Sequence, residues 1–126
     1  MRELSQFEIE AASHAAHEVL RSYSRNVLDD YTHAAWDDVP EESKREVRQN
    51  VISIMQYDYT AEKSHEIWMA QKLASGWRWG NVKNPEKREH PCLVEYKLLP
   101  EEQRFKDELW VSTVRLMLTS FLKRPQ

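Results

Sequence analysis

The sequence predicts a mainly α-helical protein of about four helices, with one structured loop or a short pair of β-strands. Apolar residues recur at helical spacing in four segments that cover most of the 126 residues. Helical periodicity is interrupted within residues 61–100, which hold both glycines, Gly76 and Gly80, and three of the five tryptophans. A chain of this length can bury a core of its own, so we expect a single domain over residues 1–126.

The first two helices are predicted by their start signals and apolar stripes. Ser5 and Glu8 have the spacing of a capping box, and the first helix is expected from about Ser5 to Tyr23. Its apolar face consists of Ala12, Ala15, Ala16, Val19, Leu20 and Tyr23. The second helix is expected from near Pro40 to about Tyr57, because a proline followed by acidic residues is typical of a helix start. Its stripe consists of Val47, Val51, Ile54 and Met55.

The third helix is expected from Thr60, as its N-cap, to Ser75, with Gly76 in the position that often ends a helix. The fourth helix begins near Pro100. Its predicted apolar face consists of Phe105, Leu109, Trp110, Val114, Met117 and Phe121. Because the stripes of the first and last helices are complementary, we expect these two helices to pack on each other. Between the third and fourth helices there is room for short strands at residues 77–79 and 93–96.

Composition limits the class of protein. A net charge of −3 argues against a dedicated binder of duplex DNA, which would usually be strongly basic. The single cysteine, Cys92, excludes an internal disulfide and suits a reducing compartment. The sequence has neither a secretory signal nor an apolar run long enough to span a membrane. We therefore expect a cytoplasmic protein with neither duplex nucleic acid nor a membrane as its partner.

The metal-binding and catalytic motifs that the sequence suggests are incomplete. His65-Glu66 is followed by Met69 where a zinc protease would have its second histidine. Pro91-Cys92 lacks the second cysteine of a zinc deaminase. No phosphate-binding glycine loop or dinucleotide fingerprint is present. We therefore expect no metal ion, no cofactor and no enzymatic activity.

Aromatic and cationic residues converge between the third helix and the loop after it. The helix places His65, Trp68 and Lys72 on one face, where Trp68 and His65 are either core residues or a platform for a flat ligand. In extended backbone Trp77 and Trp79 would point to the same side, either as a clamp on a flat ligand or as a lid on the core. The candidate ligand-binding residues are His65, Trp68, Lys72, Trp77, Trp79 and Lys83.

A dense pattern of residues runs through the same region. It consists of Ala61-Glu62, His65-Glu66, Trp68, Lys72, Gly76-Trp77, Trp79-Gly80, Lys83, His90-Pro91-Cys92-Leu93, Tyr96 and Leu99-Pro100. This pattern closely resembles the ryanodine-receptor repeat domain, or RYR domain, with its core at residues 61–100. His17-Glu18, Trp36-Asp37 and Pro40 extend the resemblance to small single-domain members encoded by phages and bacteria. The resemblance implies a mainly helical ligand-binding module that accommodates adenine nucleotides, located in the host cytoplasm if the protein is phage-encoded.

The sequence therefore favours a module that binds a small molecule, a nucleotide or a nucleotide-derived signal, in a pocket of tryptophan, lysine and histidine. The alternative is a protein–protein interaction module that uses an exposed aromatic patch, with a homodimer as one form of it. Trp36 and Trp110 lie in or beside apolar stripes without cations near them in sequence. We expect both of them to be structural.

Overall fold

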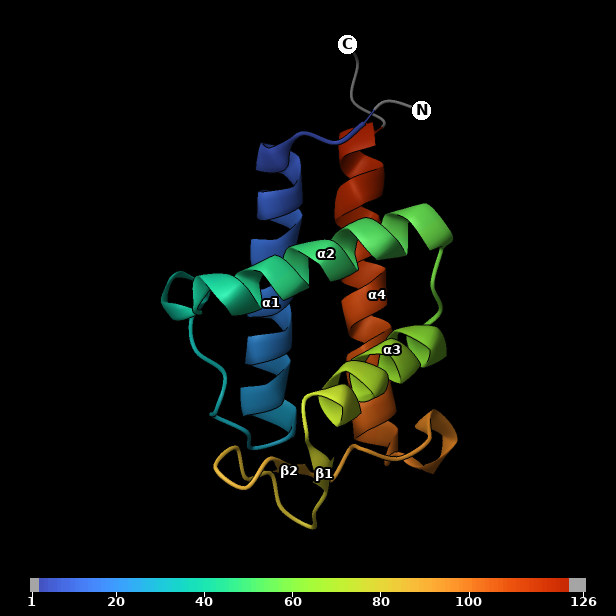
Figure 1. Cartoon of the computed structure of the whole chain (residues 1–126). Coiled ribbons are helices and arrows are strands. Elements are labelled where there is room, and N and C mark those ends of the chain that lie inside the picture. Colours follow the sequence, from blue (N-terminus) through green and yellow to red (C-terminus); the bar gives the residue numbers. More distant parts are fainter. Residues whose placement is uncertain (1–2, 123–126) are drawn as a thin grey trace.

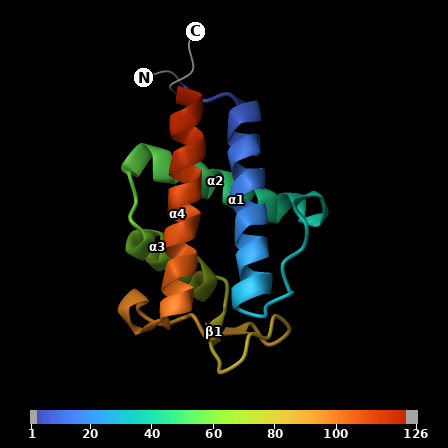
Figure 2. The same cartoon turned by 180° about the vertical axis from the view of Figure 1, so that it is seen from behind.

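Two long helices that run antiparallel to each other form the frame of the protein. The computed structural model describes residues 3–122. The helices α1 (Gln6–Val27) and α4 (Glu101–Leu122) lie side by side, with the start of α1 next to the end of α4 (Figures 1 and 2). Small residues of α1, Ala12 and Ala16, share one buried core with Val111 and Val114 of α4. The predicted packing of the first helix on the last is confirmed.

The capping box of α1 is formed as the sequence predicts. Ser5 Oγ accepts a hydrogen bond from the Glu8 backbone N–H at 3.1 Å, and Glu8 Oε1 accepts one from the Ser5 N–H at 3.0 Å. The helix runs on to Val27, past the expected end at Tyr23, because no glycine or proline interrupts these residues. The chain leaves the helix at Asp29, whose φ of 52° lies in the left-handed region.

The helix α2 (Glu41–Tyr57) crosses the pair α1 and α4, and α3 (Ala61–Ala74) packs on α4 (Figure 1). Both begin where the sequence predicts. Thr60 caps α3 by accepting a hydrogen bond from the Lys63 N–H at 3.1 Å. The core between the helices is completed by Val51 and Ile54, both almost fully buried. The described fold is thus mainly helical with four α-helices in residues 3–122.

The face that α4 buries matches the predicted one in part. Val114 is fully buried as predicted, and Trp110, Met117 and Phe121 pack partly buried against the core. Val111 and Leu118, which were not predicted, are buried as well. Phe105, expected in the core, is 54% exposed, and its ring lies beside Tyr23 with 5.7 Å between centroids. The first turns of α4 extend beyond the hydrophobic core, which is why an apolar residue there remains accessible.

The loop after α3 contains a two-residue parallel strand pair, β1 (Arg78–Trp79) with β2 (Glu89–His90). The first strand lies where it was predicted, but the prediction of a second strand at residues 93–96 is wrong. The turn that ends at Glu89 brings the chain back to β1 earlier, and Tyr96 begins a 3₁₀ helix, η2 (Tyr96–Leu98). Another 3₁₀ helix, η1 (Trp36–Asp38), precedes α2.

The two glycines serve the loop in different ways. Gly76 has a φ of 87° and ends α3, in the position that the sequence predicts. The φ of Gly80 lies outside the left-handed region, so its role is a different one. Instead β2 approaches Gly80 closely, and a Cβ at this position would stand 2.5 Å from the Cβ of Glu89. Close backbone approach therefore explains the second glycine.

Candidate functional site

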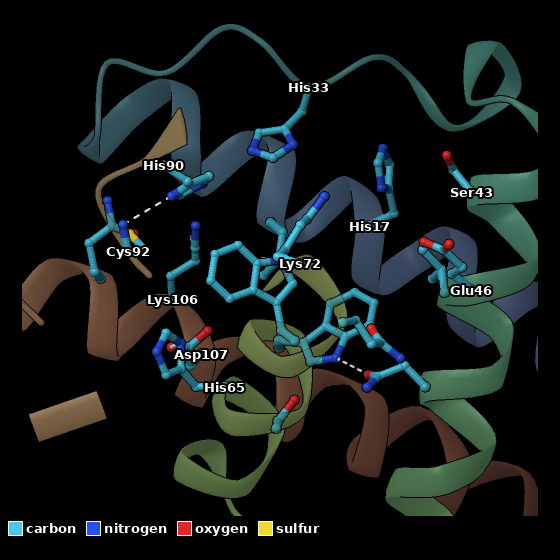
Figure 3. Close-up of a pocket in the computed structure, with 18 of the residues that line it drawn as sticks. His17, His33, Ser43, Glu46, His65, Lys72, His90, Cys92, Lys106 and Asp107 are labelled. Atoms are coloured by element: carbon cyan, nitrogen blue, oxygen red, sulfur yellow. Dashed lines mark hydrogen bonds and ion pairs between the residues drawn. The ribbon is translucent and has the colours of Figure 1, made fainter. Parts of the chain in front are cut away.

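A cavity of about 510 Å³ opens where the four helices and the loop after α3 converge. Three indole rings line it, those of Trp68, Trp77 and Trp110, together with lysines and histidines from several elements. Figure 3 shows Lys106 and His90 on one side of this cavity and Glu46 of α2 on the other. The volume lies within the usual range for small-molecule sites, and the lining combines aromatic faces with many polar and charged side chains.

The structure brings five of the six sequence-predicted residues to this cavity. These are His65, Trp68, Lys72, Trp77 and Lys83. Three of them lie on α3 at positions i, i+3 and i+7, so one helical face carries them all. Trp77 follows directly at the end of this helix, where its N–H donates to the Lys72 carbonyl at 3.0 Å.

Trp79 is the exception. Its side chain is 55% exposed and does not line the cavity. The expectation that Trp77 and Trp79 share one side assumed continuous extended backbone, but β1 begins only at Arg78, and Trp77 directly follows the left-handed residue Gly76. The two-indole clamp is therefore not formed, and Trp77 faces the cavity without Trp79.

The indoles of the cavity wall keep part of their surface accessible. Trp68 and Trp77 are both half-buried. The Lys72 ammonium lies over the Trp77 ring, 4.6 Å from its centroid, which fixes a cation beside an aromatic face. The ring of His90 meets Trp68 edge-on, with 5.0 Å between centroids. This arrangement offers flat apolar surface next to positive charge.

The buried His65 and the half-buried Asp107 form a pair in the cavity lining. The Val94 carbonyl accepts a hydrogen bond from His65 Nε2–H at 2.8 Å, which leaves His65 Nδ1 facing Asp107 Oδ2 at 3.5 Å. Burial raises the pKa of the Asp107 carboxyl to about 6, although the neighbouring Lys106 and His65 oppose this rise. His65 is thus a buried residue that also lines the cavity, and its part in a platform for a flat ligand stays a prediction.

Three lysines from different elements line the cavity on the side of His90: Lys72 of α3, Lys83 of the loop and Lys106 of α4. Their combined field reaches two histidines. Burial first, and then these three ammonium groups, lower the pKa of His90 to about 3. Burial and the field of Lys83 likewise lower the pKa of His33 to about 4. Both imidazoles are therefore neutral at physiological pH.

Lys83 also joins the loop after α3 to the segment between α1 and α2. Its Nζ donates a hydrogen bond to Thr32 Oγ1 at 2.8 Å and lies 3.8 Å from Asp30 Oδ2. Burial alone would raise the pKa of Asp30, but hydrogen bonds from Thr32 and the charge of Lys83 hold it at about 2. Asp30 is therefore ionised, and it places one negative charge beside the lysines.

The tautomer of His90 is fixed by the backbone. The Cys92 N–H donates a hydrogen bond to His90 Nδ1 at 3.0 Å, so the neutral ring carries its proton on Nε2. The Cys92 thiol itself is buried, and burial raises its pKa, so it remains a protonated thiol. His90 therefore offers the cavity a neutral N–H donor, whereas Cys92 contributes packing.

Sequence reasoning missed several cavity residues. His17, His33, Lys106 and Asp107 come from α1, the segment after it and α4, outside the 61–100 region. Only the packing of the helices brings these residues to the site, so no local spacing indicates them. Trp110 was predicted to be purely structural. Its Nε1–H does donate to Asn50 Oδ1 at 2.7 Å, but its half-buried ring also lines the cavity.

Two further properties of residues 3–122 bear on the class of site. Within this range no three histidine, cysteine, aspartate or glutamate side chains are grouped so that they could hold a metal ion. Over the same range no helix is long and apolar enough to cross a membrane.

Comparison with protein-family models gives a match for this chain. The model of the RyR domain matches residues 41–121, which run from the start of α2 through α3 and the loop to the last turn of α4. The match covers more than half of the 126 residues. The chain therefore belongs to the RyR domain family.

Proposed function

We propose that this RyR-domain protein is a binding module, without catalytic activity, for a small molecule that carries a flat ring and an anionic group. A nucleotide or a nucleotide-derived signal has this chemistry. The observation that carries the proposal is the convergence of three indoles and three lysines on a single cavity of about 510 Å³. Aromatic rings next to cations match the two halves of such a ligand.

The ring would bind against the half-buried indoles of Trp68 and Trp77. Stacking of a base on an aromatic side chain contributes about 1–3 kcal/mol. Because Lys72 lies over the Trp77 ring, it can reach an anionic group attached to a ligand that binds in the cavity. The ammonium groups add an attraction that weakens as salt concentration rises.

The proposal is tested by screening nucleotides for a rise in melting temperature, because a ligand that binds only the native state stabilises it. Hits are then titrated by tryptophan fluorescence and calorimetry at low and high salt. We expect binding to quench fluorescence and to weaken at high salt. Trp77→Ala should reduce affinity by roughly 5- to 150-fold, the equivalent of one lost stacking contact.

Trp79→Ala is the matched control, because this tryptophan lies two residues away on the same loop and outside the cavity. It should bind as the parent protein does. Equal losses in the two variants would show that binding does not use the cavity. If no nucleotide or related anion stabilises the protein, the proposal is wrong.

Protein–protein interaction is the second candidate, and one observation favours it. Trp79 and Val82, close in sequence on the loop, are 55% and 70% exposed. Large apolar side chains at such exposure can mark an interaction surface. Sedimentation of the parent protein over a range of concentrations tests self-association. A concentration-dependent mass that disappears in Trp79→Ala would support this candidate.

A further inference from the structure

Two of the three lysines at the cavity have no ion-pair partner in residues 3–122. This inference rests on the proposed function and concerns the anionic group of the ligand. Lys83 has a carboxylate partner, Asp30, whose Oδ2 lies 3.8 Å from Lys83 Nζ. Lys72 and Lys106 form no ion pair among the described residues, and the Lys72 ammonium lies over the Trp77 ring instead. Two ammonium groups of the cavity lining are thus available to an anion.

Neither of the two carboxylates in the cavity lining, Asp107 and Glu46, pairs with these lysines. Asp107 Oδ2 faces His65 Nδ1 at 3.5 Å, and no ion pair joins it to Lys72 or Lys106 in residues 3–122. Glu46 lies on the other side of the cavity from Lys106 (Figure 3). The two lysines therefore remain without a carboxylate partner among the described residues.

The number of donors also matches a particular anion. The lysines approach from three separate elements, so each can meet a different oxygen of one bound group. His90 adds an Nε2–H donor that stays neutral, because its Nδ1 is held by the Cys92 N–H. A terminal phosphate presents three free oxygens and nearly two negative charges. A phosphodiester has only two free oxygens and one charge.

We propose that the side of the cavity lined by Lys72, Lys83 and Lys106 takes a terminal phosphate, as in a phosphomonoester, and discriminates against phosphodiesters. A singly charged group would leave one ammonium without a partner in a partly buried site. Electrostatic attraction is stronger there than in water, so the second charge contributes directly to affinity. The ligand class is thus narrowed from nucleotides in general to those with a free terminal phosphate.

The experiment uses isothermal titration calorimetry on the full chain. The probes are the four common ribonucleosides, each as the free nucleoside, the 5′-monophosphate and the 3′,5′-cyclic monophosphate. For every base that binds, the 5′-monophosphate should bind at least about tenfold more tightly than the cyclic diester, the equivalent of one unbalanced charge. A diester that binds as tightly as the monoester overturns the inference while leaving the proposed function standing. If none of the probes binds, the proposed function fails, and the inference with it.

Lys106→Gln tests whether the unpaired ammonium groups of the cavity cause the preference for the phosphomonoester. It removes one ammonium that has no ion-pair partner in residues 3–122, so the fold is expected to be retained, as circular dichroism will show. The preference for the monoester should fall toward unity, because its affinity drops more than that of the diester. Lys87→Gln is the control, since Lys87 is exposed on the same loop outside the cavity. Equal weakening of both ligands by Lys106→Gln contradicts the inference. Lys72→Gln provides a second variant if Lys106→Gln does not fold.

Discussion

Replacement of Trp36 by alanine should destabilise the protein strongly. Trp36 is 2% exposed and connects the segment between α1 and α2 to α1. Its backbone N–H donates to Glu18 Oε2 at 3.0 Å and its Nε1–H to Glu10 Oε1 at 2.9 Å. The indole also packs against the ring of His17, with 5.4 Å between centroids. Truncation removes the packing and the side-chain hydrogen bond together.

The size of the effect follows from these contacts. Deletion of a buried tryptophan side chain costs about 3–5 kcal/mol, against a total stability of about 5–15 kcal/mol for a domain. A loss of this size lowers the melting temperature by roughly 10–20 °C in a protein of this length. Trp36→Phe keeps most of the packing and loses the Nε1–H bond to Glu10, so we expect an intermediate loss of about 1–2 kcal/mol.

Urea denaturation followed by circular dichroism measures these changes. Trp79→Ala serves as the comparison, since it deletes the same side chain from a site that is 55% exposed. It should change the free energy of unfolding by no more than about 0.5 kcal/mol. If Trp36→Ala unfolds at the same urea concentration as the parent, or if Trp79→Ala is equally destabilised, the assignment of Trp36 as a structural anchor is refuted.

Two other predictions concern the loop and the histidines. Gly80→Ala should destabilise the protein by about 1–3 kcal/mol in urea unfolding, because the new Cβ would stand 2.5 Å from the Cβ of Glu89 in β2. Gly76→Ala should cost about 1–2 kcal/mol for another reason, because its φ of 87° strains a residue that carries a Cβ. An unchanged free energy of unfolding in either variant would contradict the explanation given for that glycine. The pKa values of His33 and His90 are about 4 and 3, below that of an unfolded histidine. The neutral imidazoles therefore contribute fully to the free energy of unfolding above pH about 6.5, and this contribution is lost as pH falls toward 4. The raised pKa of Asp107 has the opposite effect, because protonation of this carboxyl between pH about 6 and 4 favours the folded state. Asp107→Asn removes this effect, so its free energy of unfolding should fall more steeply on acidification than that of the parent. An unchanged or shallower slope would contradict this prediction.

The parts of the fold that could be predicted from the sequence are mostly those fixed by interactions between residues close in sequence. The capping box of Ser5, the cap of Thr60 and the helix end at Gly76 each involve residues within a turn of one another. Their geometry is therefore independent of what packs against them. The sequence also predicted correctly that His65 and Lys72 of α3 lie on the same side, because residues seven positions apart in a helix share one face.

The remaining features depend on contacts between distant segments. β2 forms at Glu89 because a turn returns the chain to β1, and nothing in the composition of residues 89–90 indicates a strand. The position of Trp79 was wrong because alternation applies only within continuous extended backbone. The charge at the cavity arises when Lys106 of α4 approaches Lys83 of the loop, a juxtaposition that only tertiary packing produces.

Different segments of α1 and α4 form the core and line the cavity, so different parts of the same two helices serve stability and the proposed binding. On α1, Ala12 and Ala16 belong to the core, and His17 one residue later lines the cavity. On α4, Trp110 lines the cavity, and the fully buried core begins at Val111. The half of the frame near the chain ends therefore carries the apolar packing, while the other half leaves room for lysines and histidines whose burial is unfavourable. Since Lys72 and Lys106 are half-buried and have no ion-pair partner in residues 3–122, an anion bound between them should stabilise the half of the protein that contains the cavity.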